Sequence, residues 1–284
     1  MIKVNKPNFI EYKQCQIIEA CTYNMRNGVR LNNILSSKNS IVQASLNYDQ
    51  LANQGKLSTI STHNSVSGGA TKDDMVWLYD AKFVQDGGRK YYNKIMLLPT
   101  NGICPMCGKR TVSTLDHYLP KTKYPTYAVT AFNLLASCSE CNKVKLTKTI
   151  ASREEETIHP YYDDFNDEVW LKAVIIEEFP IGFIFTVYKP DTWIDEKFKR
   201  AKNHFATFRL SSLYSAHAAD IFSSYKIQLK RLYRRRGIEA IREDLEDRMV
   251  SNREVRLNSW EAAVYAALLN SSWFFDTYIP AEMS

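Results

Sequence analysis

The 284-residue sequence contains no uninterrupted run of about 18 apolar residues, the length that a membrane-spanning helix requires. Its first residues, MIKVNKPNFIEYKQ, lack the apolar core of a secretory signal. Internal repeats and low-complexity segments are absent, and so is the Gly-x-x-x-x-Gly-Lys-Ser/Thr loop that binds nucleotide phosphates in many ATPases. We therefore expect a soluble, cytoplasmic protein that makes no membrane contact and senses nucleotides only through another chain.

The sequence also has only a small excess of charge of one sign. The chain has 37 Lys and Arg against 31 Asp and Glu, which gives a net charge of +6. This mild basicity permits nucleic-acid binding without demanding it. A hydrophobic content of 45% is enough for one or two domains with their own cores.

Cysteines are few, but four of the six form two Cys-x-x-Cys pairs thirty residues apart: Cys104, Cys107, Cys138 and Cys141. Two such pairs can hold one metal ion in a tetrahedral site of four sulfurs. Disulfides are the alternative, and the absence of a secretory signal argues against them. The spacing predicts a structural zinc ion without an open position for catalysis. We assign no role to Cys15 and Cys21.

The residues around these pairs suit the hydrolysis of a phosphodiester bond. This reaction needs a water made nucleophilic and a cation that neutralises the growing charge. A neutral imidazole with a pKa near ~6.5 can accept the proton of that water, and His117 is the candidate. Carboxylate and amide oxygens suit a hard cation, Mg²⁺ or Mn²⁺, which makes Asp116 and Asn142 the candidate ligands.

Together, the two cysteine pairs, Asp116-His117, Asn133 and the ending Cys-Asn-x-x-Lys resemble the HNH endonuclease family, over about a sixth of the chain. The resemblance implies a ββα-metal fold, with two short strands and a helix around one divalent cation. Asn142 stands where the name-giving members have histidine, and many members carry asparagine there. By resemblance, Asn133 is a structural residue of the catalytic centre whose side chain binds the loop that carries His117.

Several lysines surround this motif: Lys121, Lys123, Lys143, Lys145 and Lys148. We expect Lys121, Lys143 and Lys145 to contact the phosphates of nucleic acid, while an ordinary solvated face is the alternative. His159, in a His-Pro-Tyr segment after the motif, either approaches the active centre or is a packed histidine. Packing is the favoured interpretation.

The expected fold class is α+β and mainly helical, with a zinc-stabilised ββα-metal core between helical flanks. We expect a helical and loop region over residues 1–98, the nuclease core over 99–165, and a hairpin followed by helices over 166–284. Residues 26–70 show no strong periodicity, so this part is expected to become ordered only on a partner. Other expected elements are helices over 71–84, 90–98, 195–210, 212–236, 238–251 and 260–269, and a hairpin over 170–188.

Two features of the C-terminal part leave alternatives open. Six cations crowd the last turns of the helix over 212–236: Lys226, Lys230, Arg231, Arg234, Arg235 and Arg236. They either complement the helix dipole or form a phosphate-binding stripe. The aromatic cluster near the chain end is either an interface anchor or part of its own core: Trp273, Phe274, Phe275 and Tyr278.

The whole layout also resembles the PtuB family, the nuclease subunits of Septu-type anti-phage defence systems. This resemblance implies an ATPase partner similar to PtuA, and in some systems a retron reverse transcriptase with its noncoding DNA. The sequence thus predicts a metal-dependent endonuclease acting on DNA, with RNA including tRNA as another substrate. An inactive, zinc-stabilised nucleic-acid-binding module is the alternative function. Removal of residues 1–70 is expected to weaken the partner complex and spare the zinc core.

Overall fold

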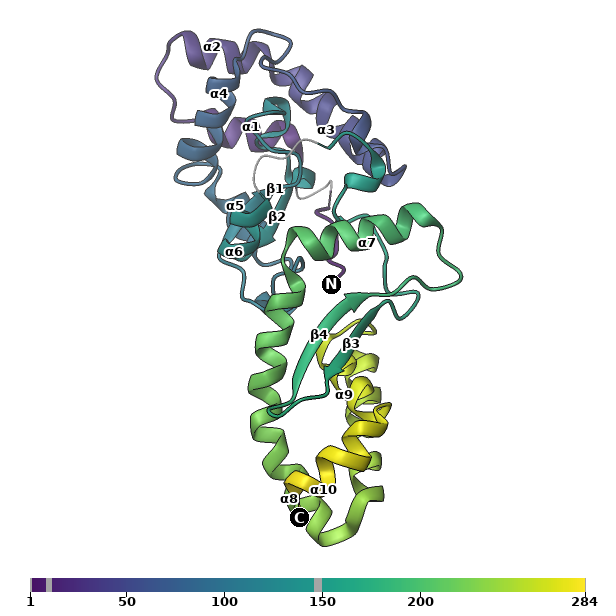
Figure 1. Ribbon diagram of the computed structural model, residues 1–284. Coiled ribbons are helices and arrows are strands. Elements are labelled where there is room, and N and C mark those ends of the chain that lie inside the picture. The colour runs from purple at the N-terminus through teal and green to yellow at the C-terminus, as the bar shows by residue number, and fades with distance from the viewer. Residues whose placement is uncertain (1, 9–11, 146–149, 284) are drawn as a thin grey trace. The chain divides into compact units, whose positions relative to one another are not determined.

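The computed structural model of the protein describes residues 2–8, 12–145 and 150–283. The chain forms two compact units, Ile2–Asp164 and Phe165–Ser284 (Figure 1). The fold is α+β and mainly helical, with two small sheets of two strands each. No described helix is both long and apolar enough to cross a membrane. The finer division into three regions at residues 98 and 165 remains a prediction.

In the N-terminal unit, helices precede and follow a small sheet. The helices are α1 (Gln14–Thr22), α2 (Val29–Ser36), α3 (Lys38–Asn53), α4 (Lys72–Trp77), α5 (Arg89–Met96) and α6 (Ser139–Lys145). Short 3-10 turns are η1 (Leu57–Thr59), η3 (Thr100–Gly102), η4 (Pro125–Tyr127), η5 (Ala131–Asn133) and η6 (Arg153–Glu155). The expected helices over 71–84 and 90–98 are confirmed within a few residues.

The expectation that residues 26–70 lack structure of their own is wrong, because α2 and α3 form there. In α3, Ile41, Ser45, Tyr48 and Ala52 are buried and recur every three or four residues. This face is narrow and half of it is small or polar, so the sequence pattern is weak. The helix is stabilised by packing against the rest of its unit.

Helix α4 continues directly into a π-helical turn, η2 (Leu78–Phe83). Its start is fixed by a capping box, in which Thr71 and Asp74 each accept a hydrogen bond from the other's backbone N–H. Such π turns widen a helix locally and recur at functional sites. This one presents Tyr79 and Asp80 to the region described below.

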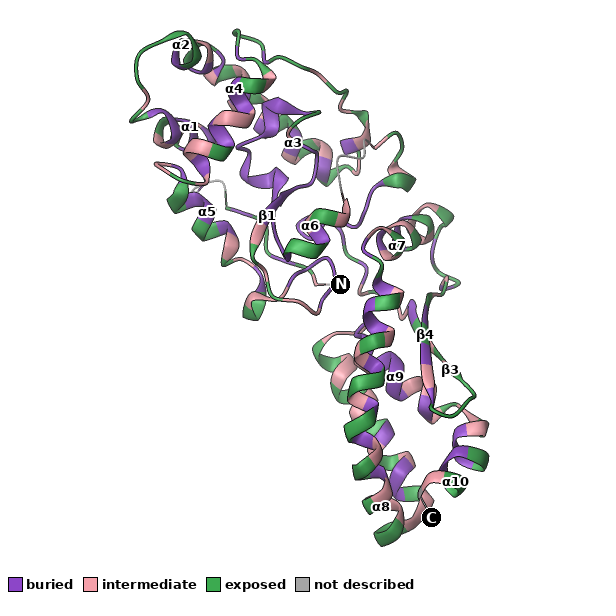
Figure 2. Cartoon of the chain, turned by 60° about the vertical axis from the view of Figure 1, so that its left-hand side comes forward, coloured by how far each residue is buried: buried purple, intermediate pink, exposed green. Residues whose placement is uncertain are grey.

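The sheet of the N-terminal unit pairs β1 (Thr114–His117) with β2 (Leu134–Ser137) in antiparallel register. Leu115, Leu134 and Ala136 belong to a core shared with α1, α4, η2 and α5, which appears as the buried colour around β1 in Figure 2. Helix α6 follows β2 after a single residue, Cys138. Strand, loop, strand and helix thus follow one another along the chain. Lys148, one of the lysines noted in the sequence, lies outside the described residues.

The C-terminal unit combines a hairpin with helices. Its elements are β3 (Leu171–Ile176), β4 (Gly182–Val187), α7 (Asp195–Thr207), α8 (Leu210–Val255), α9 (Trp260–Leu269), η7 (Phe274–Tyr278) and α10 (Ile279–Met283). The expected hairpin and C-terminal helices are therefore confirmed. Gly237 interrupts α8 with φ 77° and ψ −167°, as expected from its position between two helical stretches. Figure 1 shows α8 reversing its direction at the far end of the unit.

The aromatic cluster at the chain end packs inside the C-terminal unit. Phe274, Phe275 and Tyr278 are buried, and the ring of Tyr278 lies 5.7 Å from that of Phe222 on α8. Phe179, in the hairpin turn, stacks on Tyr278 at 5.5 Å. The alternative of packing against its own unit is confirmed for Phe274, Phe275 and Tyr278. An interface role stays a prediction for Trp273, which is half-buried.

Candidate functional site

The four cysteines of the two Cys-x-x-Cys pairs come together although thirty residues separate the pairs. Their sulfur atoms are buried and all lie within 4.8 Å of one another. A zinc ion with four Zn–S bonds of about 2.3 Å places its sulfurs about 3.8 Å apart, so the cluster fits zinc.

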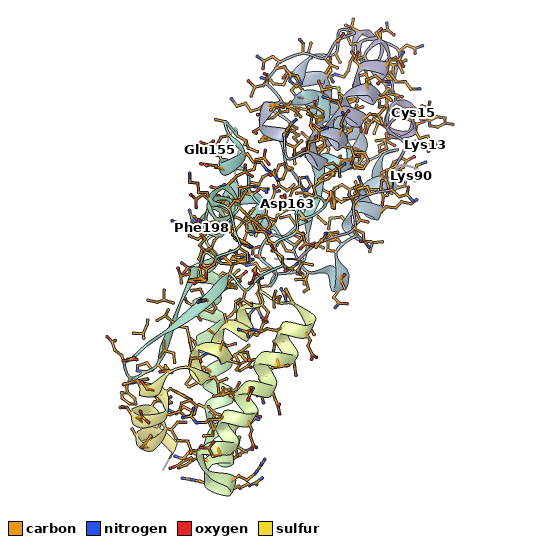
Figure 3. The ribbon with its side chains drawn as sticks, turned by 90° about the vertical axis from the view of Figure 1, so that its right-hand side faces the viewer. Lys13, Cys15, Lys90, Glu155, Asp163 and Phe198 are labelled. Carbon is orange, nitrogen blue, oxygen red and sulfur yellow. The ribbon has the colours of Figure 1, made fainter. Side chains whose placement is uncertain are left out.

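Backbone groups shape each half of this cluster. The Arg110 N–H donates to Cys107 Sγ at 3.5 Å, and the Cys141 N–H donates to Cys138 Sγ at 3.4 Å. Gly108 adopts φ 61° at the turn after Cys107, a conformation that favours glycine. Cys15 and Cys21 are not part of this group, and Figure 3 labels Cys15 beside Lys13 and Lys90.

Asp116 lies on β1 with only 7% of its surface exposed. Burial raises the pKa of its carboxyl group, and the ammonium group of Lys145 opposes this shift. Asp116 Oδ2 lies 2.9 Å from Lys145 Nζ as an ion pair, but the angles are not those of a hydrogen bond. The buried carboxylate is therefore balanced by the Lys145 ammonium group, and a cation ligated there would share this oxygen with Lys145.

His117 is the next residue on β1 and is fixed by its surroundings. Its Nε2 lies 2.8 Å from the carbonyl oxygen of Ala128, so Nε2 carries the proton and Nδ1 is the basic nitrogen. The ring packs edge-on against Tyr79 at 4.3 Å. Burial lowers the pKa of His117 to about 3, with further lowering by Lys121 and Lys145, so the imidazole is neutral at cellular pH.

Asn133 is completely buried at the start of β2 and binds the loop that follows His117. Its Oδ1 accepts from the Leu119 N–H at 2.7 Å, and its Nδ2 donates to the Leu119 carbonyl at 3.0 Å. A further bond runs from Nδ2 to the Tyr127 carbonyl at 3.2 Å. Every one of these partners lies in the segment between β1 and β2, so Asn133 sets the path of that segment.

Asp116, His117 and Asn142 line one cleft of about 540 Å³, which β1, η2 and α6 enclose. A carboxylate and an amide oxygen at one cleft are the donor set that Mg²⁺ or Mn²⁺ prefers, so the residues fit such an ion. Of the predicted phosphate ligands, Lys121 and Lys143 line the cleft, and Lys143 is exposed. Lys145 pairs with Asp116, and Lys121 pairs with Asp80 at 2.5 Å.

A 27%-identical relative, Protein ea31 of Escherichia phage lambda, aligns over 282 residues, covering 92% of this chain and 95% of the phage protein. Septu protein PtuB of Bacillus thuringiensis is 34% identical over 91 residues, which covers 29% of this chain and 35% of PtuB. No protein-family profile and no solved structure matches the sequence. The similarity to ea31 extends along nearly the whole chain, and its name states no activity. The partial similarity to PtuB is consistent with a distant relation.

Sequence reasoning missed Tyr79, Asp80 and Tyr92, which line the same cleft from η2 and α5. No motif marks them, because a π-helical turn leaves no signal in the sequence. His63 was also passed over: its Nε2 lies 2.8 Å from Thr126 Oγ1, and its ring packs against Tyr124 and Tyr127. It supports the segment between β1 and β2 from outside the cleft.

His159 is buried behind the site rather than in the cleft. Its Nδ1 accepts from the Tyr161 N–H at 3.2 Å, and its Nε2 lies 3.3 Å from the Tyr48 hydroxyl. The ring packs against that of Tyr118, the residue after His117, at 4.2 Å. The interpretation of a packed histidine is confirmed.

Proposed function

We propose that the protein is a metal-dependent HNH endonuclease that hydrolyses phosphodiester bonds of nucleic acid, with DNA as the favoured substrate and RNA, including tRNA, as the other. The observation that carries this proposal is the cleft in which Asp116, His117 and Asn142 meet. Its walls come from η2, α5, β1, the segment after β1 and α6. The strand β1 pairs with β2, and α6 follows β2 and carries Cys141 of the four-cysteine cluster. This arrangement supports the predicted ββα-metal core.

His117 is the general base of the proposed reaction. The neutral ring accepts the proton of the attacking water at Nδ1, because Nε2–H is already donated to the Ala128 carbonyl. That bond, the Tyr79 ring and the segment held by Asn133 keep the imidazole in one orientation. Because the imidazole is already oriented before the substrate binds, less entropy is lost in reaching the reactive geometry.

Asp116 and Asn142 are the proposed ligands of the catalytic cation, Mg²⁺ or Mn²⁺. When bound, such an ion stabilises the charge that develops on the phosphate and on the leaving oxygen. Lys145 neutralises Asp116 from the helix side and holds the carboxylate in place. Lys143, Lys121 and Lys145 remain the proposed nucleic-acid contacts, and Lys143 is the one that is exposed.

Plasmid nicking in the presence of Mg²⁺ or Mn²⁺ tests this function. His117→Ala removes the base and is expected to lower the rate about 10² to 10⁴-fold while nucleic-acid binding persists. His217→Ala on α8, in the other unit, is the matched control and should cut like the wild type. A His117→Ala protein that nicks at the wild-type rate contradicts the assignment.

An inactive zinc-stabilised binding module is the second candidate function. The pairing of Lys145 with Asp116 favours it, since an ammonium group already balances the carboxylate. A protein that binds zinc and nucleic acid but shows no divalent-dependent cleavage supports this candidate. Asn142→Ala separates the two, because it should weaken cleavage at low Mn²⁺ and have no effect on binding.

The biological setting we propose is that of an effector subunit in an anti-phage defence complex. The partial similarity to Septu protein PtuB supports this proposal. The expected partner is an ATPase subunit similar to PtuA, and in some systems a retron reverse transcriptase with its noncoding DNA. Gentle purification from the native operon tests it, and a fully active protein that elutes alone contradicts it.

A further inference from the structure

Residues 226–236, here called the basic segment, form the end of the first leg of α8. Their sequence, KIQLKRLYRRR, holds six Lys and Arg and no acidic residue. Without these six, the 37 basic residues of the chain would fall to 31 and would equal its 31 acidic residues. The basic segment therefore carries a charge of +6, equal to the net charge of the whole chain, and the rest of the chain is balanced.

Three of the six cations bind partners within the C-terminal unit. Lys226 pairs with Glu282 at 2.5 Å, and Lys230 Nζ donates to the Glu282 carbonyl at 3.5 Å. Arg236 pairs with Glu243 on the returning leg at 3.0 Å. The other three cations, Arg231, Arg234 and Arg235, are exposed and have no ion-pair partner within the described part of the chain.

These three arginines share one side of the helix, since residues three and four positions apart are neighbours on its surface. They lie just before Gly237, where α8 reverses. The returning leg is held to the first by Tyr225, whose hydroxyl donates to Asp244 Oδ2 at 2.6 Å. In Figure 2 the part of α8 near its reversal, at the bottom of the view, is largely in the colours of exposed and intermediate residues. The arginine face is thus presented to solvent on an anchored helical hairpin.

Interaction with the helix dipole does not account for the whole of this face. A helix C-terminus favours cations only within its last turn, and Arg231 precedes that turn. Like charges at spacings of three and four residues destabilise a helix. A bound polyanion would remove that repulsion, and guanidinium groups bind phosphate with two parallel hydrogen bonds.

We propose that Arg231, Arg234 and Arg235 bind the sugar–phosphate backbone of a nucleic acid, as a contact surface additional to the cleft of the N-terminal unit. The inference rests on the proposed function for its class of ligand. Contacts of this kind neutralise phosphates without reading bases, so binding should be independent of sequence and steeply dependent on salt.

The test uses full-length protein and fluorescent 20-base-pair duplexes of DNA and of RNA, with anisotropy measured over a range of salt concentrations. The test variant carries Arg231→Ala, Arg234→Ala and Arg235→Ala. The control carries Lys56→Ala, Lys94→Ala and Lys202→Ala, which removes three exposed, scattered cations and the same net charge. Both are checked for helical content and zinc content before use.

The test variant should raise Kd about tenfold or more, and the slope of log K against log salt should fall by about 2 to 3, near 0.9 per lost phosphate contact on DNA. The control should stay within about twofold of the wild type. Equal loss in both variants, or wild-type Kd and slope in the test variant, overturns the proposal. The DNA and RNA arms identify which backbone is bound.

Binding and cleavage separate this inference from the proposed function. If wild-type protein cuts no nucleic acid but the arginine variant still loses affinity and salt slope, the nuclease proposal fails and the arginine face stands. If the arginine variant binds like the wild type while His117→Ala abolishes cutting, the arginine face fails and the nuclease stands.

Discussion

At the scale of single residues, the site depends on buried polar side chains that the chain itself holds in place. Asn133 is the clearest example, because its three bonds hold the segment between β1 and β2. An asparagine in this role cannot be replaced without leaving backbone groups unpaired in the core. The cost of such unpaired groups is about 1–3 kcal/mol each.

Asn133→Ala is therefore expected to lower the free energy of unfolding by about 3 kcal/mol and to reduce cleavage by misplacing His117. Urea denaturation followed by circular dichroism measures the first effect. Asn270→Ala is the control, since Asn270 is exposed and bonds only to Ala266 of its own helix. Equal stability of the two variants would show that Asn133 is dispensable.

The grouping of the candidate site residues was the easiest feature to predict from sequence. Asp116, His117 and Asn142 were expected to share one centre, and they line one cleft. Their types and spacing carry that information. Tyr79 and Asp80 were not predictable, because they reach the cleft through tertiary packing of a π turn that no local pattern encodes.

At the scale of elements, the two cysteine pairs and the reversal of α8 are the features that single substitutions test most directly. The four cysteines bring two distant turns together and could hold a zinc ion. Gly237 joins the two legs of α8.

Cys104→Ser should remove the zinc and unfold the turns around β1, because structural zinc contributes ~10 kcal/mol or more to small modules. Elemental analysis of wild-type protein should give one zinc per chain, and the variant should be insoluble or zinc-free. Cys15→Ser, which lies outside the sulfur cluster, should keep the metal. Folded wild-type protein without zinc would refute the assignment.

Gly237→Ala should destabilise the C-terminal unit by about 1–3 kcal/mol, because φ 77° with ψ −167° is a conformation that only glycine adopts readily. No atom lies within 4 Å of the added Cβ, so the effect is conformational rather than steric. Gly28→Ala has equal space and an extended φ, and should leave the melting temperature unchanged. A shift for Gly28 as large as that for Gly237 would argue against this cause.

The capping box of α4 predicts a dependence of stability on acid. Burial alone would raise the pKa of Asp74, but hydrogen bonds from the Thr71 N–H, Arg30 and Asn33 outweigh it and lower the pKa. Because the pKa of Asp74 is lower in the folded state, its ionised carboxylate stabilises the fold at pH values above the unfolded-state pKa of ~3.9. This stabilisation is lost as the pH falls through the folded-state pKa. Asp74→Asn should therefore cost about 1 kcal/mol at pH 7 and almost nothing at pH 2, as urea midpoints at the two pH values would show.

At the scale of the whole molecule, elements that appeared peripheral in the sequence are part of the core. Ile17, Ile18, Ile34 and Ile41 are buried in the same cluster as Leu115 on β1. Removing residues 1–70 is therefore expected to unfold the N-terminal unit, contrary to the expectation that the zinc core survives. The weak hydrophobic periodicity of residues 26–70 gave no sign of this burial, because a helix that its neighbours cover needs few apolar residues of its own.

A soluble, zinc-containing fragment of residues 71–164 would contradict this conclusion. Limited proteolysis of the full chain gives a second readout, since cleavage between α3 and α4 should leave the two pieces associated. The predicted helical and hairpin elements of the C-terminal unit needed no such long-range information, because their periodicity is local.

The first residues of the chain lie against segments made much later. The Ile2 N–H donates to the Pro105 carbonyl at 3.2 Å, and the Val4 N–H donates to the Pro160 carbonyl at 3.0 Å. During synthesis the beginning of the chain must wait until the His159-Pro160 segment has left the ribosome, and only then can the N-terminal unit close. A nascent chain that stops short of this point lacks the Val4–Pro160 hydrogen bond, so its N-terminal unit stays open on the side where residues 2–4 pack.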